Sequence, residues 1–240
     1  TSARKTILPA VSADVKGVHI TMPPRERFDK ELSGLTADLM DMASMVNGVI
    51  RKTSETLEEN DMKQAHRIQE GDVVINRFER HIEQTCLSLI KRESPIASDL
   101  RLITAALKII TDLERAADQC ADICEIIERS GTAPHLEPSE MLLPMMSLAE
   151  DQFANALSAY FDEDKERAQM VMKGDEPVNA MFTKCVNGVA KVISDQPTDA
   201  MAAVDTMMIA KYIERIGDHA TNIAEWATGR HPKEALLDEN

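Results

Sequence analysis

The segment YIERIGDHATNIAEW, residues 212–226, sets polar residues at intervals of four between apolar ones. On an α-helix this spacing places Glu214, Asp218 and Asn222 along one face. Two carboxylates and an amide in a row, with no lysine between them, repel one another unless a cation or a basic partner offsets their charge. The segment therefore predicts a helix that carries a candidate site on its polar face.

The same acidic row occurs in the first half of the chain. Residues 99–125 match residues 199–225 at a constant offset of 100 positions. The matching residues are Asp99 and Asp199, Ile109 and Ile209, Glu114 and Glu214, Arg115 and Arg215, Asp118 and Asp218, Ile123 and Ile223, and Glu125 and Glu225, with Asp122 opposite Asn222. Upstream, the pattern of Asp72 and Asn76 returns as Asp175 and Asn179, at an offset of 103. The chain is therefore two copies of one unit.

Apolar residues recur at intervals of three and four through both copies, which predicts three helices in each. The predicted helices span about 25–56, 61–92, 95–129, 139–160, 164–193 and 197–228. Gly71 predicts a bend in the second helix and Gly174 with Pro177 an interruption at the same place in the fifth. Ser94 and Pro95 predict the N-cap and first position of the third.

These helices predict an all-α fold of two tandem three-helix bundles, because short connections make successive helices antiparallel neighbours. Residues 25–131 form the first predicted bundle and residues 132–231 the second. Residues 1–24 lack a helical period and end in two prolines, so we expect a flexible arm there, and we expect a polar tail at 232–240.

Composition narrows the classes of partner. The 240 residues carry a net charge of −14, which disfavours a nucleic-acid or anionic-lipid surface and favours cations or basic protein patches. The four cysteines are widely spaced except for Cys120 and Cys124, which lie four apart on a helical pattern, so we expect reduced, packed thiols, which suits a reducing cytoplasm. No segment has the roughly 18 uninterrupted apolar residues of a membrane span, so we expect a cytoplasmic protein that meets a membrane only through partners.

The polar rows of the second and third helices of each copy predict metal sites. Asp72 and Glu114 both lie about 30 Å of helix from the turn near Ser94, so the two rows meet at similar height. The candidate ligands are Asp72, Asn76, Glu114, Asp118 and Asp122 in the first copy, and Asp175, Asn179, Glu214, Asp218 and Asn222 in the second. Oxygen ligands without thiolate suit iron, manganese or magnesium better than a structural zinc, although the residues do not single out one metal.

Two other interpretations of the acidic rows stay open at this point. Acids at four-residue spacing also form solvated helix faces, and Arg115 or Arg215 could neutralise them through salt bridges without any metal. His219 stands where the first copy has Gln119. We consider it either an extra ligand or, as the simpler interpretation, a surface histidine.

The two signature regions resemble the PhoU family of phosphate-signalling proteins. Residues 210–224 are similar to the family's second signature, and residues 98–101 together with 113–115 are similar to its first. The resemblance extends over roughly residues 28–229. Ala116 and Ala117 stand where the first signature often has Ile-Gly.

This resemblance implies two similar helical bundles in a protein associated with high-affinity phosphate uptake. Family members act as negative regulators that convey the state of the phosphate ABC transporter to a membrane sensor histidine kinase. Several hold multinuclear metal clusters through the paired acidic motifs, which here match Glu114 with Asp118 and Glu214 with Asp218. Iron, manganese, magnesium and zinc are all candidate metals, and a homodimer stays open.

We therefore expect a metal-binding regulatory adaptor rather than an enzyme. The alternative is a helical di-metal hydrolase or oxidase, since clustered carboxylates can hold two metals that activate water. No E-x-x-H motif and no pair of nucleophile and base stands beside the rows, which disfavours catalysis. A purely structural scaffold is a third hypothesis.

Overall fold

The structure, a computed structural model, describes residues 24–131, 136–174 and 176–228, and this part of the chain contains helices and no strand. The helices are α1 (Pro24–Glu59), α2 (Met62–Glu93), α3 (Ala97–Ser130), α4 (Leu142–Phe161), α5 (Lys165–Lys173), α6 (Glu176–Asp195) and α7 (Ala200–Ala227). Short 3-10 turns, η1 (Glu137–Met141) and η2 (Pro197–Asp199), precede α4 and α7. The predicted all-helical fold is confirmed, with the fifth helix divided into α5 and α6.

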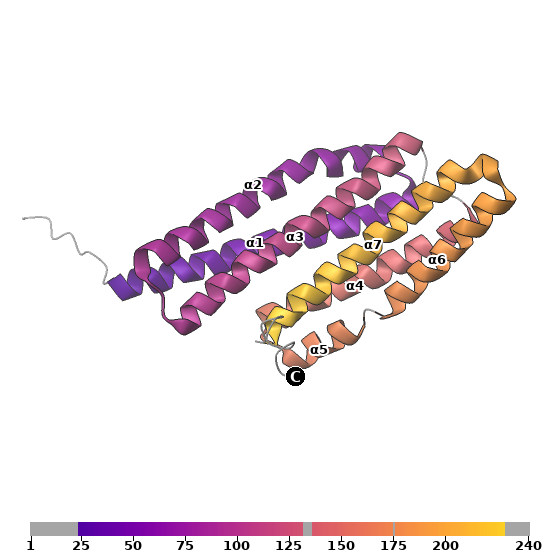
Figure 1. Cartoon of the computed structure of the whole chain (residues 1–240). Coiled ribbons are helices and arrows are strands. Elements are labelled where there is room, and N and C mark those ends of the chain that lie inside the picture. Colours follow the sequence, from indigo (N-terminus) through magenta and orange to yellow (C-terminus); the bar gives the residue numbers. More distant parts are fainter. Residues whose placement is uncertain (1–23, 132–135, 175, 229–240) are drawn as a thin grey trace, which may run out of the picture.

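The helices form two groups that lie against each other (Figure 1). The first group is α1, α2 and α3, the second is α4, α5, α6 and α7, and contacts of α3 with α7 and of α1 with α4 join them. One continuous hydrophobic core runs through both groups and includes the fully buried Met42, Leu113 and Phe153. The predicted domain boundaries stay a prediction, and the expected arm up to residue 23 and the tail lie outside the described residues. No described helix has the length and apolarity that a membrane crossing requires.

The connection between α2 and α3 differs from the prediction. Ser94 does not cap α3 but ends α2, in the left-handed conformation with φ of 44°. Ile96 is the N-cap residue of α3 and offers no side-chain hydrogen bond. The reason is Pro95, which disfavours the right-handed helical conformation for the residue before it. Gly131 ends α3, close to the predicted end near residue 129, with φ of 69° and its amide donating to the Glu128 carbonyl.

The two glycines that were predicted to disturb corresponding helices behave differently. α2 runs without interruption through Gly71, so the helix does not end there, and the predicted bend stays a prediction. At Gly174 the helix does end, with the glycine amide donating to the carbonyl oxygens of Met170 and Val171 at 2.9 and 3.0 Å. Pro177 follows in the first turn of α6, where its missing N–H costs nothing but where it could not continue α5. The proline, which the first copy lacks, decides the difference.

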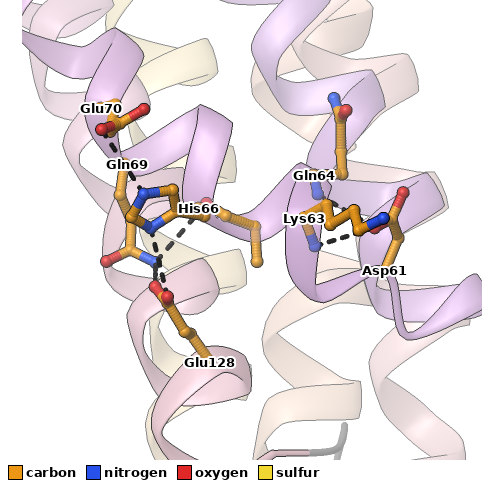
Figure 2. A network of polar contacts seen from close by, with 8 residues as sticks. Asp61, Lys63, Gln64, His66, Gln69, Glu70 and Glu128 are labelled. Atoms are coloured by element: carbon orange, nitrogen blue, oxygen red, sulfur yellow. Dashed lines mark hydrogen bonds and ion pairs between the residues drawn. The ribbon is translucent and has the colours of Figure 1, made fainter.

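A polar network fixes α2 against α3 at the end away from their connection (Figure 2). Asp61 caps α2 by accepting hydrogen bonds from two amides of its first turn at 2.9 and 3.0 Å. The Glu128 carboxylate of α3 accepts a hydrogen bond from Gln69 Nε2 at 2.7 Å, and its other oxygen lies 3.2 Å from His66 Nδ1. Asp72 follows Gln69 by three residues and Asp122 precedes Glu128 by six, so the network links α2 to α3 close to the acidic rows.

The four cysteines are buried and unpaired, as predicted. They are Cys86, Cys120, Cys124 and Cys185. Burial raises the pKa of the Cys86 thiol to about 11 and that of Cys124 to about 12. Since the thiolate is the reactive form, these thiols act as small core residues and not as reactive groups.

Two glycines offer a matched test of the packing of η1 on α6. A Cβ added at Gly188 would lie 2.9 Å from the Pro138 ring, whereas one added at Gly34 of α1 would meet nothing within 4 Å. We expect Gly34→Ala to raise the free energy of unfolding by about 0.5–1 kcal/mol through helix propensity. Gly188→Ala should lower it by about 1 kcal/mol, because the rigid proline ring has to move. Urea unfolding measures both, and an equal gain in the two variants would show that η1 does not pack as described.

Candidate metal-binding site

Asp72 and Asn76 form the α2 wall of the first site. They lie one turn apart, and Asn76 Nδ2 donates to Asp72 Oδ2 at 2.7 Å. The remaining oxygen of each side chain, Asp72 Oδ1 and Asn76 Oδ1, is buried and has no hydrogen-bond partner. Unsatisfied buried acceptors are costly and uncommon in folded proteins. Both are hard oxygen donors of the kind that metal cations bind.

Glu114, Asp118 and Asp122 form the α3 wall and are half-buried. Burial, followed by the charges of Glu114 and Asp72, raises the pKa of Asp118 to about 6. Burial is also the main cause that raises the pKa values of Glu114 and Asp122, and the Asp72 carboxylate contributes to both. Asp72 therefore lies within electrostatic range of all three acids, which agrees with the predicted facing of the two walls in this copy.

The structure adds Glu79 to this group of acids. Burial, followed by the charge of Glu83, raises the pKa of Glu79, and Asp118 adds to the increase. Glu79 follows Asn76 by three residues, so the helical spacing places it on the same face of α2. Sequence comparison between the copies could not find it, because Phe182 occupies the corresponding position in the second copy.

Salt bridges do not neutralise the first row. Arg115 Nε lies 3.5 Å from Glu114 Oε2, and its side chain is 56% exposed. Its charge lowers the pKa values of Glu114 and Asp118, yet both are raised overall. Burial and mutual repulsion of the acids therefore outweigh this arginine, so the interpretation of the row as an internally paired surface does not fit the first copy.

The donors fit a hard cation in type but are not drawn together in this structure. Within residues 24–131, 136–174 and 176–228, no three His, Cys, Asp or Glu side chains are close enough to form a metal site as they stand. The first copy has carboxylate and amide oxygens, two of them without partners, and acids with raised pKa values. A cation would have to bring these side chains closer, and the metal assignment stays a prediction.

The second copy departs from the first at Glu214. Its carboxylate pairs with the Lys211 ammonium one turn earlier on α7, and Lys211 Nζ also lies 5.2 Å from the centre of the Phe182 ring. The second row is therefore partly neutralised. The repeat gave no signal for Lys211, because it precedes the acidic row and its counterpart in the first copy is Thr111.

The wall opposite Glu214 is only partly described. Asp175 lies outside the described residues, Asn179 is half-buried on α6, and Asp218 is exposed on α7. The predicted facing of Asp175 and Asn179 toward the α7 row stays a prediction.

The third position of each row lies at the contact between the two copies. Asn222 Nδ2 donates to Asp112 Oδ1 at 2.9 Å, and His219 Nδ1 lies 2.9 Å from the same oxygen. The His219 side chain is only 15% exposed, so its interpretation as a surface histidine is wrong. Likewise, Asp122 acts on Tyr212 of α7 and raises its pKa, after burial as the main cause. The repeat did not point to Asp112 as a polar residue of this contact, because its counterpart in the second copy is Tyr212.

The chain is similar to known proteins over most of its length. A family model described as the PhoU domain matches residues 39–127 and 142–227, one match in each copy. The phosphate-specific transport system accessory protein PhoU homolog of Clostridium acetobutylicum is 31% identical over 202 residues, which cover 84% of this chain and 92% of that protein. The homolog with the same description from Burkholderia sp is 32% identical, covering 83% and 86%.

Solved structures agree with this match. The crystal structure of PhoU from Pseudomonas aeruginosa has a TM-score of 0.79 at 26% identity and covers 89% of this chain and 100% of that chain. The phosphate transport system regulatory protein PhoU from Streptococcus pneumoniae has a TM-score of 0.75 at 25% identity, covering 85% and 98%. The arrangement of helices in Figure 1 is thus one that these proteins share.

Proposed function

Because the chain belongs to the PhoU family, we propose that it is a metal-binding adaptor that regulates phosphate uptake and phosphate-starvation signalling. Its relatives are described as accessory and regulatory proteins of phosphate transport, not as enzymes, which sets aside the di-metal hydrolase or oxidase. In this proposal the protein docks on the phosphate ABC transporter and on a sensor histidine kinase and acts as a negative regulator.

The pair of facing walls in the first copy carries the metal part of the proposal. Asp72 and Asn76 present two buried oxygens without partners, opposite Glu114 and the half-buried Asp118. These four residues would hold the cation, with Glu79 and Asp122 at the margins of the site. A bound cation would supply positive charge that offsets the repulsion among the acids and would link α2 to α3.

Metal and partner would influence each other through binding linkage. A cation that stabilises one arrangement of α2 and α3 raises the affinity of any partner that prefers this arrangement, by the same factor in both directions. The net charge of −14 favours partners with basic patches and fast, salt-dependent association with them. Both features suit a protein that exchanges between a transporter and a kinase.

The proposal predicts that metal tightens partner binding. The chelator-treated chain should bind the isolated ATPase subunit of the transporter and the kinase portion of the sensor saturably, and added manganese or iron should lower the Kd about tenfold. The Glu114→Gln, Asp118→Asn double variant should keep its metal-free affinity and lose the tightening. Asp41→Asn, which changes an exposed acid of α1, is the matched control.

Different outcomes of this experiment contradict different parts of the proposal. Absence of binding to both partners would overturn the adaptor and favour the structural scaffold. Partner binding that metal does not change would overturn the linkage alone. Analytical ultracentrifugation of the chain alone would show whether the protein is a homodimer, which stays a prediction.

A further inference from the structure

A pocket of about 400 Å³ lies between the two groups of helices, where α3 begins and α7 ends. Figure 1 shows the last turn of α7 close to α5 at this end of the molecule. The walls of the pocket are mainly apolar and come from both copies. The apolar lining residues are Leu35, Leu39, Leu102, Tyr160, Phe161 and Trp226. Leu102 is 38% exposed, so the pocket offers apolar surface that the core does not cover. The acidic rows contribute no lining residue.

Two basic side chains border this apolar surface. Arg101 comes from the second turn of α3 and Lys165 from the first residue of α5, and both are exposed and line the pocket. In the part of the chain that the structure describes, neither forms an ion pair, although acidic residues outnumber basic ones by 41 to 27. One acid, Glu163, also lines the pocket and leaves the pair of cations in excess.

We propose that this pocket binds a small organic carboxylate whose apolar body packs against Trp226 and the leucines and whose charged end lies between Arg101 and Lys165. A planar guanidinium matches a carboxylate through two parallel hydrogen bonds, and the ammonium adds a second charge from the other copy. Apolar walls with few polar groups are the usual composition of a small-molecule site. Thr36 and Ser98 also line the pocket, but their hydroxyls donate to the Leu32 carbonyl at 3.1 Å and to the Asp99 carboxylate at 3.5 Å, so Arg101 and Lys165 supply the donors for the charged end.

Trp226 provides a direct probe because it is the single tryptophan of the chain. Titration of the full chain with octanoate should change its fluorescence saturably, whereas octylammonium and inorganic phosphate should not. Arg101→Gln and Lys165→Gln should each weaken octanoate binding about three- to tenfold. Lys108→Gln removes an exposed lysine of the same helix outside the pocket, and its affinity should stay unchanged.

A second measurement guards against misfolded variants. Octanoate should raise the thermal midpoint of the unmodified chain and leave that of the Arg101→Gln, Lys165→Gln double variant unchanged, while both proteins have the same midpoint without ligand. A fluorescence change that does not saturate would overturn the proposal. So would equal binding of octylammonium, or an equal loss in Lys108→Gln, since either means that the two pocket cations do not select the ligand.

Discussion

Replacing Asp118 with asparagine is expected to stabilise the metal-free protein at pH 8 and to weaken metal binding at the first site. In the folded protein, burial, Glu114 and Asp72 raise the pKa of Asp118 from 3.8 to about 6. The folded state therefore holds this proton more tightly than the unfolded state. The resulting stability is fully present below pH 4 and is lost as the pH rises through 6. Asparagine avoids the loss because it cannot ionise.

Asp118 is only partly buried, so solvent screening reduces the full effect of such a shift to about 1 kcal/mol. Urea unfolding in the presence of chelator should show this gain for Asp118→Asn at pH 8 and a smaller one at pH 5. Asp41→Asn should change stability by less than about 0.5 kcal/mol at both pH values. A loss of stability at pH 8 would mean that Asp118 is stabilised by a partner in the metal-free fold.

The same variant tests the cation site. Isothermal titration of the chelator-treated chain with manganese or iron should give saturable binding, and Asp118→Asn should weaken it by about two orders of magnitude at the first site. Unchanged binding in this variant would contradict the assignment of Asp118 as a ligand. A metal-free protein that is more stable but binds metal more weakly is the signature of a residue kept for binding at a cost in stability.

Removing the Arg129 side chain is expected to cost about 1–3 kcal/mol of folding free energy. Asp205 of α7 is only 6% exposed, and it accepts hydrogen bonds from Arg129 Nη2 at 2.5 Å and Ser130 Oγ at 2.9 Å. Arg129→Met leaves this buried carboxylate with the serine alone. Arg167→Met, which breaks ion pairs to more exposed acids, should cost less than about 1 kcal/mol.

Chemical denaturation of the single and double variants measures the contribution of the Arg129–Asp205 contact to the free energy of unfolding. Asp205→Asn in the Arg129→Met background should recover part of the loss, because it removes the uncompensated charge. If Arg129→Met costs no more than Arg167→Met, the contact contributes no more than a surface pair. No sequence signal pointed to Asp205, since its counterpart in the first copy is Ala105.

Helical periodicity and the repeat were sufficient to predict the helices, and the predicted facing of the first two walls agrees with the electrostatics of the structure. Equal distances of Asp72 and Glu114 from the connection put the walls at one height, and their electrostatic contact agrees with this. The prediction that the third residue of the second row shares a face with the first is wrong for a geometric reason. Residues four apart advance about 400° around a helix, so Asn222 is rotated by about 80° from Glu214. The Asn222 side chain therefore contacts Asp112 of α3, whereas the Glu214 side chain pairs with Lys211.

The α3–α7 contact has the form of an isologous interface within a single polypeptide. Asp112 of α3 accepts a hydrogen bond from Asn222 of α7, and the charge of Asp122 of α3 acts on Tyr212 of α7. With the offset of 100 residues between the copies, each of these pairs corresponds to the other with the two helices exchanged. Their common centre falls at Ala117 and Gly217, both buried and small enough for the helices to approach closely. The two copies are thus related by a pseudo-twofold axis at this contact. At the pseudo-axis a residue of one copy lies opposite its counterpart in the other, as Ala117 does with Gly217. A larger side chain at this point of one copy therefore has to be accommodated by the other copy.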